Sequence, residues 1–591
     1  MIKQRLFARA YAHSTIFLLG LSWSMTAWSG QPRPVTDIRS IDGMGNNLLH
    51  ADWAAAETPM IRQKATAANS DANYPGDGSG STFAGGPGSD SSLPEPRTVS
   101  NLLFDSPLAS QPNTTLLSSM VWQWGQFLDH DITLVETSDE PAEMAPIATS
   151  PDDPLAPAIP FQRSHYAPSS GTSSANPRQQ VNSISSYIDA SNVYGSNPIR
   201  TAALRGTGGQ LKTSAGELLP YNVSGLPNAG GNCADLMLGG DVRANEQVGL
   251  TAMHTLFVRE HNRLVGLLET NHSDWTEDQL FQTARKLVGA EMQAITYREF
   301  LPALLGEDDP LRPQAADYHY DVTINASVSN EFAASIYRFG HSMLPSKLLL
   351  PALGDQPGEA LPLKEAFFTP DFFAGDATGS TRRVEQLLLG MTWQMAMEID
   401  PMAIDDVRNF LFGIPGSGGM DLTAINIQRG RDHGLPGYNG MRAAYGLPEV
   451  DSFSEITSDT VVQQVLSNLY DSVHQLDTWV GALAETHNSE AAVGELIRTA
   501  MVEQLTRLRD GDRYFFTGDL ELTDNPAVDA ILDLDTVTLS QIIRWNTALD
   551  NLPANVFLVA VPEPGSLGLL VLSAILTLQR RVKSKENRSV Y

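Results

Sequence analysis

The sequence predicts a mostly α-helical globular protein, built as a large helical domain with long connecting loops. Apolar residues recur with a period near 3.6 in three stretches, at 250–264, 290–305 and 461–483, as they do in amphipathic helices. Sustained alternation of apolar and polar residues, which would indicate strands, is rare. No internal repeat of solenoid length is evident in the sequence.

Length alone leaves the number of domains open. The 591 residues are several times what a hydrophobic core needs, so one large domain or two to three smaller ones are possible. The Gly-, Ser-, Pro- and Asp-rich stretch between Tyr74 and Pro96 predicts a flexible loop rather than a domain boundary. The Pro-, Ser- and Ala-rich stretch from Ser138 to Gln180 predicts a surface segment without regular elements.

The composition is acidic and almost free of cysteine. With 68 acidic and 39 basic side chains the formal charge is −29, which repels nucleic acid and anionic membranes. We therefore expect no nucleic-acid partner. Cys233 is the only cysteine, so no intrachain disulfide can form, and stability must come from packing and from any bound cofactor or metal.

The N-terminus has the order of a secretory signal peptide. Lys3, Arg5 and Arg9 come first, then an apolar stretch at 16–21, then small residues at 27–30. We therefore expect residues 1–30 to be a signal peptide and the mature chain to begin near Gln31.

The C-terminus carries a second export feature. The sequence Val-Pro-Glu-Pro-Gly at 561–565 precedes an apolar run that ends at Leu578, followed by Arg580 and Arg581. From Ser566 the run has 13 residues, whereas a membrane-spanning helix needs roughly 20, so a permanent anchor is disfavoured.

This C-terminal pattern, at 561–591, resembles the PEP-CTERM sorting signal of Gram-negative bacteria, which is recognised and removed. The resemblance implies partners in the export and sorting machinery, and a secreted, extracellular or cell-surface protein. An apolar C-terminal segment of another purpose remains the alternative.

Polar side chains gather at helical spacing in the segment 122–131. In a helix, Gln126, Asp129 and His130 share one face. An amide, a carboxylate and an imidazole beside Trp and Phe indicate a polar pocket wall in an apolar setting, which suits a histidine that transfers protons. On spacing alone, a buried structural His130 paired with Asp129 is the simpler interpretation.

The segment 122–131 resembles the distal-helix motif of the animal-type haem peroxidases of the peroxidase–cyclooxygenase superfamily, and other motifs follow in that family's order. They cover roughly Ile38 to Phe557 and imply that family's fold, a single large helical domain over 31–560 with a core of 38–557 and haem between central helices. Where secreted animal members carry a cysteine near the start, Gly45 stands here. The motifs are Arg-Ser-Ile-Asp-Gly at 39–43, Ile-Pro-Phe at 159–161, Asp-Val-Arg-Ala-Asn-Glu-Gln at 241–247, His-Thr-Leu-Phe-Val-Arg-Glu-His-Asn-Arg at 254–263, Tyr-Arg-Phe-Gly-His at 337–341 and Asn-Ile-Gln-Arg-Gly-Arg-Asp-His-Gly-Leu-Pro-Gly-Tyr-Asn at 426–439.

The resemblance implies a catalytic pair and an iron ligand. Heterolytic cleavage of hydrogen peroxide needs one group to move a proton between the two oxygens and another to stabilise negative charge on the departing one. His130 and Arg243 match these roles. His341 matches the axial ligand of the haem iron, and Asn426 matches the side chain at its other ring nitrogen, with a turn residue as the alternative for Asn426.

Further matches concern attachment of the haem, expected to be haem b. Asp129 and Glu246 match carboxylates that form ester links to haem methyl groups, and the sequence leaves open whether both links form. Gln247 stands where one branch of the family has a methionine that adds a sulfonium link. The third link should therefore be absent, and with it some of the oxidising power toward chloride.

Three polar side chains complete the implied haem environment. Arg338 and Arg429 match positions near the haem propionates, where a guanidinium can bind a carboxylate through two hydrogen bonds. Structural ion pairs are the alternative for both. Gln126 matches the residue that contacts water or halide in the distal cavity, with ordinary helix polarity as its alternative.

A calcium site is predicted from two segments. Asp131 follows His130 and points about 100° away from it around a helix, and the segment 185–191 offers side-chain oxygens on alternate residues. An all-oxygen ligand set with two carboxylates suits calcium better than magnesium. By itself, Asp189 would be interpreted as a turn residue. The family resemblance assigns to calcium Asp131, Ser185, Tyr187 through its backbone, Asp189 and Ser191.

The other histidines are predicted to be structural. His254 and His261 lie seven apart on one predicted helix without a His-Glu-x-x-His zinc pattern, and His433 lies in a turn. No Cys-x-x-Cys-His motif for covalent haem attachment is present in the sequence.

The implied function is a haem-dependent peroxidase that reduces hydrogen peroxide and oxidises halides, pseudohalides or small aromatic donors. A fatty-acid dioxygenase of the same superfamily is the first alternative, but its radical tyrosine lies three residues before the proximal histidine, where this chain has Arg338 and places Tyr337 one residue earlier. A surface or matrix protein that keeps the fold without catalysis is the second. The physiological donor, the oligomeric state and the biological role are not determined by the sequence.

Overall fold

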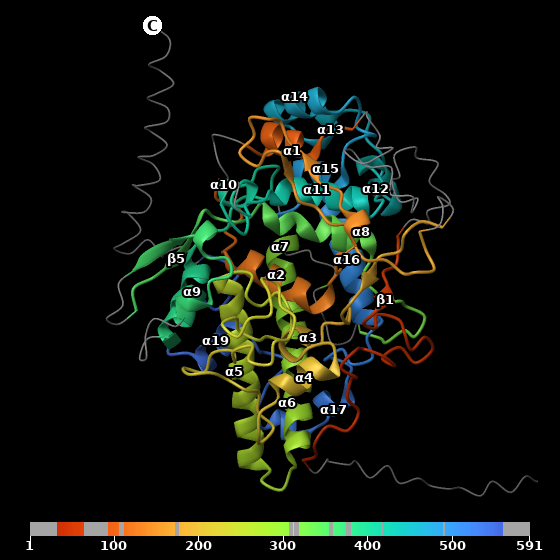
Figure 1. Ribbon diagram of the computed structural model, residues 1–591. Helices are drawn as coiled ribbons and strands as arrows, with labels where there is room; N and C mark the ends of the chain where they lie inside the picture. Colours follow the sequence, from red (N-terminus) through yellow and green to blue (C-terminus); the bar gives the residue numbers. More distant parts are fainter. Residues whose placement is uncertain are drawn as a thin grey trace, which may run out of the picture.

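Helices dominate the computed structural model, and the expected mainly α fold is confirmed (Figure 1). The described residues are 32–63, 93–105, 111–138, 140–171, 176–306, 311, 318–353, 358–373, 380–414, 418–487 and 491–559. Within them, strands form only three two-stranded antiparallel sheets. The predicted signal peptide, the C-terminal sorting segment and most of the loop predicted at 74–96 lie outside the described residues.

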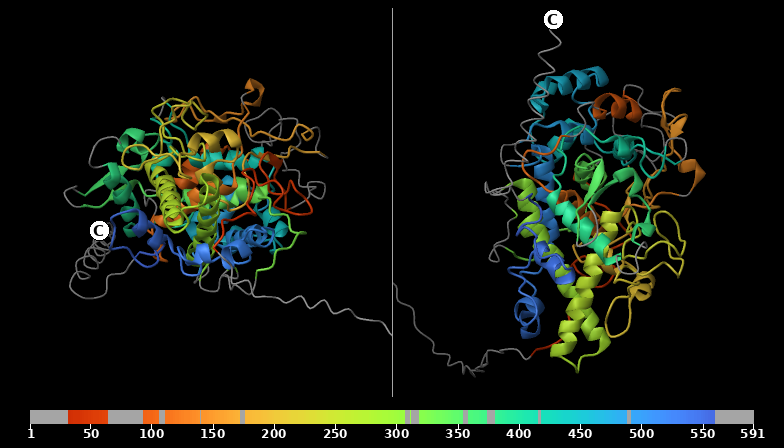
Figure 2. Two further views of the ribbon diagram at one scale, coloured as in Figure 1. Left: turned by 90° about the horizontal axis from the view of Figure 1, so that it is seen from below. Right: turned by 90° about the vertical axis from the view of Figure 1, so that its left-hand side faces the viewer.

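The two longest helices form an antiparallel pair. α5 (Val248–Asn271) and α6 (Glu277–Ile295) project beyond the rest of the molecule at the lower end of Figure 1 and of the right-hand view in Figure 2. α6 begins with a capping box, in which Thr276 and Gln279 exchange side-chain to backbone hydrogen bonds. The apolar stretch predicted at 250–264 lies on α5. The stretch predicted at 290–305 lies on the end of α6 and on the two short helical segments that follow it directly.

The helix α2 (Met120–Ile132) runs through the middle of the molecule (Figure 1). It contacts α3, α5, α9 and the 3₁₀ turn η5 (Ile336–His341). On one face, Trp124 and Phe127 pack against Phe257 of α5, with ring centroids 5.8 and 5.1 Å apart from that ring. This aromatic packing holds α2 in the core and directs its polar residues toward a cavity.

The prediction that 138–180 contains no regular elements is wrong. β2 (Ile147–Ala148) pairs with β3 (Ala158–Ile159), and the buried Ile147, Ile159 and Phe161 form a small second core against Ala424. The sequence shows only scattered apolar residues here. Their packing partner Ala424 lies far along the chain, so no local pattern indicates the pairing.

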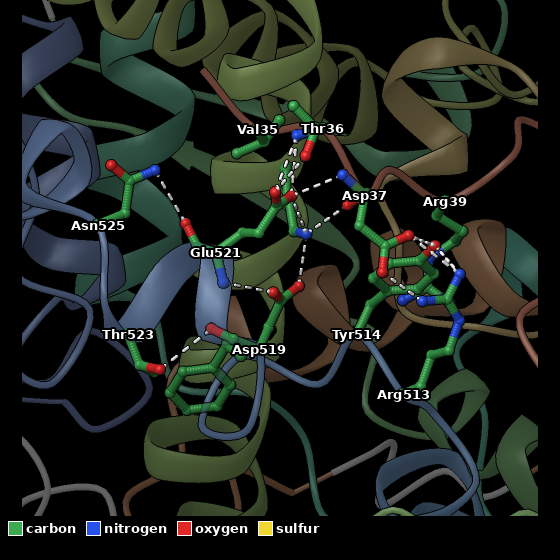
Figure 3. Close-up of polar contacts among 12 residues, drawn as sticks. Val35, Thr36, Asp37, Arg39, Arg513, Tyr514, Asp519, Glu521, Thr523 and Asn525 are labelled. Carbon is green, nitrogen blue, oxygen red and sulfur yellow. Dashed lines mark hydrogen bonds and ion pairs between the residues drawn. The ribbon is translucent and has the colours of Figure 1, made fainter. Parts of the chain in front are cut away.

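The N-terminal segment is joined to the last quarter of the chain by a polar network (Figure 3). Glu521 accepts hydrogen bonds from the backbone N–H and hydroxyl of Thr36 and from the N–H of Asp37. Asp37 in turn accepts from Arg513 and from the hydroxyl of Tyr514. The two ends of the described domain therefore stabilise one another.

The remaining elements surround this core, and none of the helices among the described residues is both long and apolar enough to cross a membrane. The remaining α-helices are α1 (Pro96–Val99), α3 (Ser191–Tyr194), α4 (Pro198–Leu204), α7 (Leu301–Leu305), α8 (Asn330–Ala334), α9 (Ser380–Trp393), α10 (Asp405–Arg408), α11 (Leu422–Asp432), α12 (Tyr438–Ala444), α13 (Phe453–Ile456), α14 (Thr460–Leu469), α15 (Thr478–Ala484), α16 (Glu495–Asp510), α17 (Leu520–Thr523), α18 (Pro526–Asp529) and α19 (Leu539–Asn546). The tighter and wider turns are η2 (Ser100–Phe104), η3 (Pro141–Glu143), η4 (Thr296–Phe300), η6 (Leu363–Glu365) and η7 (Pro370–Phe373), and the other sheets pair β1 (Thr58–Pro59) with β4 (Val181–Asn182) and β5 (Lys347–Leu350) with β6 (Glu359–Pro362).

Candidate active site

A cavity of about 330 Å³ lies between α2, the segment before α5, and η5. Apolar side chains form much of its wall, and a few convergent polar groups interrupt them, as in most small-molecule sites. Its polar lining residues are Gln126, Asp129, His130, Arg243, Glu246, Gln247, Tyr337, Arg338 and His341, and its apolar ones include Val121, Trp122, Phe339, Leu344, Phe367, Leu411 and Phe412.

His130 lies on the α2 side of this cavity and is almost fully buried. Its Nδ1 is 3.7 Å from Oδ1 of Asp241, and its Nε2 is 3.7 Å from Oε2 of Glu246. Burial, aided by the positive charge of Arg243, lowers the pKa of His130 well below its ordinary value. The imidazole is therefore neutral and able to accept a proton.

Arg243 lies beside His130 and is held by several acceptors. Its Nε and Nη2 donate to the two carboxylate oxygens of Asp241 at 2.8 and 2.9 Å, and Nη2 also donates to the backbone carbonyl of Thr133 at 2.6 Å. Its Nη1 is 3.4 Å from Oδ2 of Asp129. A fixed positive charge therefore stands next to a neutral histidine.

A chain of amides and a carboxylate crosses the cavity wall. Nε2 of Gln126 donates to Glu246 at 3.0 Å, while Nε2 of Gln247 donates to Gln126 at 3.1 Å and to Gln123 at 2.5 Å. Sequence reasoning missed Gln123, although it lies three residues before Gln126 and so on a neighbouring position of the helix surface. A Cβ at Gly249 would lie 2.6 Å from Oε1 of Gln123, so this network needs a glycine there.

The two carboxylates of the cavity wall are half-buried. Burial raises the pKa of Glu246 to about 7 and raises that of Asp129. Oδ1 of Asp129 accepts a hydrogen bond from the hydroxyl of Thr133 at 2.6 Å. Both carboxyl groups therefore stay close to the cavity in fixed orientations.

His341 lines the same cavity from the end of η5. Its Nδ1 is 2.8 Å from Nδ2 of Asn426, and Oδ1 of Asn426 accepts a hydrogen bond from Arg338 at 3.2 Å. Burial, together with the charge of Arg338, lowers the pKa of His341 to about 3. This histidine is neutral, as a metal ligand must be, and its ring orientation is set from the side of Nδ1.

Of the two arginines that were predicted near haem propionates, Arg338 alone lines the cavity. Arg338 lines the cavity, and burial together with the charge of Arg429 lowers its pKa to about 10. Arg429 is not among the residues of the cavity wall. It donates to the hydroxyl of Ser164 at 2.6 Å and to Asp432 at 3.1 Å, and its guanidinium lies 4.3 Å from the ring centroid of Phe161.

The residues predicted to bind calcium are brought together at the end of α2. The carboxylate of Asp131 accepts hydrogen bonds from the backbone N–H groups of Asp189, Ala190 and Asn192, at 3.0 to 3.2 Å. Asp189 accepts from the hydroxyl of Ser185 at 3.0 Å, and Ser191 donates to the carbonyl of Asp131 at 2.9 Å. Burial raises the pKa of both aspartates.

Two of the other histidines have the structural role that was predicted. His261 lies 2.8 Å from the hydroxyl of Tyr194 and 3.0 Å from the carbonyl of Gly209. His433, at the end of α11, lies 2.7 Å from the hydroxyl of Ser164 and 2.6 Å from Oδ1 of Asn330. Among the residues that the structure describes, no group of three or more His, Cys, Asp or Glu side chains could hold a metal ion.

Two neutral histidines from different elements line this cavity, the buried His130 beside Arg243 and the half-buried His341, and such a donor set suits an enzyme that binds haem. The sequence profile described as animal haem peroxidase matches residues 38–557. The chain belongs to the animal haem peroxidase family, and it is an oxidoreductase of the peroxidase class.

Relatives and solved structures agree with this assignment. Peroxinectin A of Dictyostelium discoideum is 32% identical over 538 residues, covering 87% of this chain and 94% of that protein. The structure of peroxidase A from the same organism aligns with a TM-score of 0.74 at 31% identity, covering 88% of this chain and all of that one. A fatty acid α-dioxygenase of Oryza sativa aligns with a TM-score of 0.69, covering 88% of this chain and 87% of that one, but at 19% identity it shows a shared fold alone.

Proposed function

We propose that this peroxidase reduces hydrogen peroxide in the cavity between α2 and η5 and oxidises halides, pseudohalides or small aromatic donors. One observation carries the proposal: His130, Arg243 and His341 line one cavity, and Nδ2 of Asn426 lies 2.8 Å from Nδ1 of His341. Bound haem supplies the redox chemistry. His341 would hold its iron.

Different residues of this chain would then act on different atoms of the bound peroxide. Neutral His130 accepts a proton from one peroxide oxygen and returns it to the other, because burial keeps its ring unprotonated. The guanidinium of Arg243 stabilises negative charge on the departing oxygen. Gln126 contacts the water or halide of the cavity, since its amide is held between Gln247 and Glu246.

Haem retention is assigned to the charged groups of the cavity wall. Asp129 and Glu246 have carboxyl groups in that wall and are our candidates for ester links, and Gln247 offers no sulfur for a third link. Arg338 is the better candidate for a propionate partner, because it lines the cavity whereas Arg429 is bonded to Asp432.

A calcium ion at the end of α2 is the second cofactor that we propose. Asp131 and Asp189 are two buried carboxylates, and the cation nearest to either is Arg39, whose Nε is 3.7 Å from Oδ2 of Asp189 among the described residues. Such a pair is costly to bury ionised unless a cation binds between them. With hydroxyls from Ser185 and Ser191 and the carbonyl of Tyr187, the donors are all oxygen, which suits calcium.

The test is steady-state peroxide turnover by purified, haem-loaded protein. We expect His130→Ala to lose roughly 10²- to 10⁴-fold in peroxide reduction, the contribution typical of a general acid–base group, while the Soret band remains. His272→Ala, at the end of α5, is the control and should keep wild-type rates. Unchanged turnover in His130→Ala would refute the role of His130, and a protein that binds no haem would refute the proposal.

The dioxygenase alternative rests on one side chain. Tyr337 lines the cavity, and its buried hydroxyl has no hydrogen-bond partner among the described residues. It lies four residues before His341, and it stacks on Phe332 with ring centroids 4.7 Å apart. Oxygen uptake with a fatty acid, in the absence of peroxide turnover, would support this alternative over ours.

We further propose that the protein is exported and sorted to the cell surface or released. The support is the order of charged, apolar and small residues at 1–30 and the Pro-Glu-Pro segment at 561–591. Mass spectrometry of the mature termini tests it: termini near Gln31 and before Val561 are expected, and an intact chain retained in the cytoplasm would contradict it.

A further inference from the structure

Asp241 connects the two residues that act on peroxide. Its side chain is 1% exposed. One carboxylate binds Nε and Nη2 of Arg243, and the same carboxylate stands 3.7 Å from Nδ1 of His130. The backbone N–H of Arg243 also donates to it, at 2.8 Å.

We propose that Asp241 is a positioning residue of the peroxide site, which fixes the guanidinium of Arg243 in its working orientation and presents its own negative charge to the rear nitrogen of His130. The inference rests on the proposed function, because it gives Asp241 a role only through Arg243 and His130. Asp241 is not among the residues that line the cavity, so it acts on peroxide only through residues that do.

The need for such a residue follows from the other carboxylates nearby. Nη1 of Arg243 is already 3.4 Å from Asp129, and Glu246 also faces the cavity. Without Asp241, the carbonyl of Thr133 would be the remaining acceptor among the described residues apart from these two groups, and the guanidinium could turn toward them and away from peroxide. Two parallel hydrogen bonds to one carboxylate restrict that rotation, because they fix both the position and the plane of the guanidinium.

The charges at Arg243 agree with a permanent ion pair. Burial alone would lower the pKa of Arg243, but the carboxylate of Asp241 raises it above the ordinary value. Burial would likewise raise the pKa of Asp241, but the charge of Arg243 and its hydrogen bonds hold it below the usual range. Both groups therefore stay ionised in the interior, where each has the other as its principal counter-ion.

Asp241 is itself fixed against the segment predicted to bind calcium. Its N–H donates to the carbonyl of Asn192 at 3.0 Å, and the N–H of Asn192 donates to Asp131. A Cβ at Gly240 would lie 2.4 Å from the carbonyl carbon of Val193, so the backbone contact requires glycine at this position. The Gly240–Asp241 pair thus connects Arg243 to the end of α2 through the backbone at Asn192. This connection is additional to the direct contacts that Arg243 makes with the end of α2.

The experiment compares Asp241→Asn, Arg243→Gln and the double variant in haem-loaded protein. Asparagine keeps the shape but carries no charge and accepts through one oxygen only. We expect Asp241→Asn to slow the second-order reaction with peroxide roughly 100-fold, the cost of a misplaced catalytic group. Oxidation of an aromatic donor by enzyme already treated with peroxide should stay near the wild-type rate, since neither His130 nor Arg243 is assigned to that step.

The double variant distinguishes positioning from general structural support. If Asp241 works mainly through Arg243, adding Asp241→Asn to Arg243→Gln should cause a further loss far smaller than that of Asp241→Asn alone, because contacting residues of one network are not additive; the remaining loss is the effect of its charge on His130. Fluoride binding to the ferric haem, followed by absorbance, gives a readout independent of turnover: we expect Asp241→Asn and Arg243→Gln to weaken it by similar factors. Additive losses, or unchanged fluoride affinity in Asp241→Asn, would overturn the inference.

Asp153→Asn is the matched control. Asp153 also binds an arginine, Arg97, through two hydrogen bonds at 2.8 and 3.0 Å, but away from the cavity. It should leave the peroxide rate and fluoride binding unchanged. A wild-type protein without peroxide turnover would contradict the proposed function, whereas an active wild type with an equally active Asp241→Asn variant would contradict this inference alone.

Discussion

Burial prepares individual side chains for different tasks in one cavity. It keeps His130 and His341 neutral, as the proton transfer proposed for His130 and the iron binding proposed for His341 both require. It also leaves Glu246 with a pKa of about 7, which would be unusual for a glutamate in water. The same physical effect therefore sets the protonation state of acids and bases alike.

Asn426 should control how well His341 holds iron. Its amide is the side chain nearest to Nδ1 of His341 and also accepts from Arg338. We expect Asn426→Ala to lower iron affinity or peroxide activity roughly 10- to 100-fold, as is typical when the outer partner of a ligand histidine is removed. Haem content after dialysis, from the ratio of Soret to protein absorbance, measures the first effect. Asn468→Ala, on the exposed side of α14, is the control, and an equal haem content in both variants with equal turnover would contradict the assignment.

At the scale of elements, α2 directs side chains into three different surroundings within two turns. Gln126 and His130 face the cavity, Asp129 lies at its wall, and Asp131 turns toward the 185–191 segment. Because a helix advances about 100° per residue, consecutive residues at 129–131 reach different surroundings. The aromatic face of the same helix, packed on α5, keeps these directions constant.

Removal of calcium should therefore disturb the peroxide site. A chelator would leave Asp131 and Asp189 buried without their proposed counter-ion, and the segment 185–192 should loosen first. At a calcium concentration 100-fold above its Kd, the stabilisation lost is about 2.7 kcal/mol. Hydrogen exchange should rise in 185–192 and in the second half of α2, and peroxide turnover should fall.

Two comparisons test the calcium prediction. Added calcium should restore exchange and turnover whereas magnesium should not, and Asp189→Ala should no longer respond to the chelator. Exchange that stays unchanged across 185–192 in wild-type protein would show that no ion binds there.

At the scale of the whole molecule, contacts between segments far apart in sequence stabilise the domain. The N-terminal segment around Thr36 and Asp37 has its main polar partners in the last quarter of the chain (Figure 3). The single cysteine allows no intrachain disulfide, so such contacts and packing must stabilise the domain without covalent cross-links.

Glu521→Ala should release the N-terminal segment. One carboxylate accepts from three donors, the N–H and the hydroxyl of Thr36 and the N–H of Asp37, and a hydrogen bond to a charged group contributes at most about 1.5 to 3 kcal/mol. Because the network is partly exposed, we expect a total loss of about 2 kcal/mol, seen as faster proteolytic cleavage near residue 40 at unchanged haem content. Glu449→Ala, an exposed site elsewhere, should cleave as the wild type does, and equal cleavage of all three proteins would contradict the prediction.

Local patterns in the sequence were sufficient for the helical class and for much of the distal wall. The 3.6-residue period predicts α5 and the end of α6 with its continuation, because the burial of one helix face follows from spacing. The positions of Gln126 and His130 on one face of α2 follow from the same spacing. The pairing of β2 with β3 could not be predicted from local spacing, since their core is completed by Ala424 from another part of the chain.

Tertiary structure decided which of the recognised motif residues work together. The family resemblance predicted both Arg338 and Arg429 near the haem propionates. Only Arg338 lines the cavity, whereas Arg429 is paired with Asp432. Asp241 stood within a recognised motif without a role, and its contacts with Arg243 and His130 became visible only in three dimensions. The reason is physical: periodicity and motif spacing describe one stretch of chain, whereas ion pairs, burial and the pKa values they set depend on groups that folding brings from separate stretches.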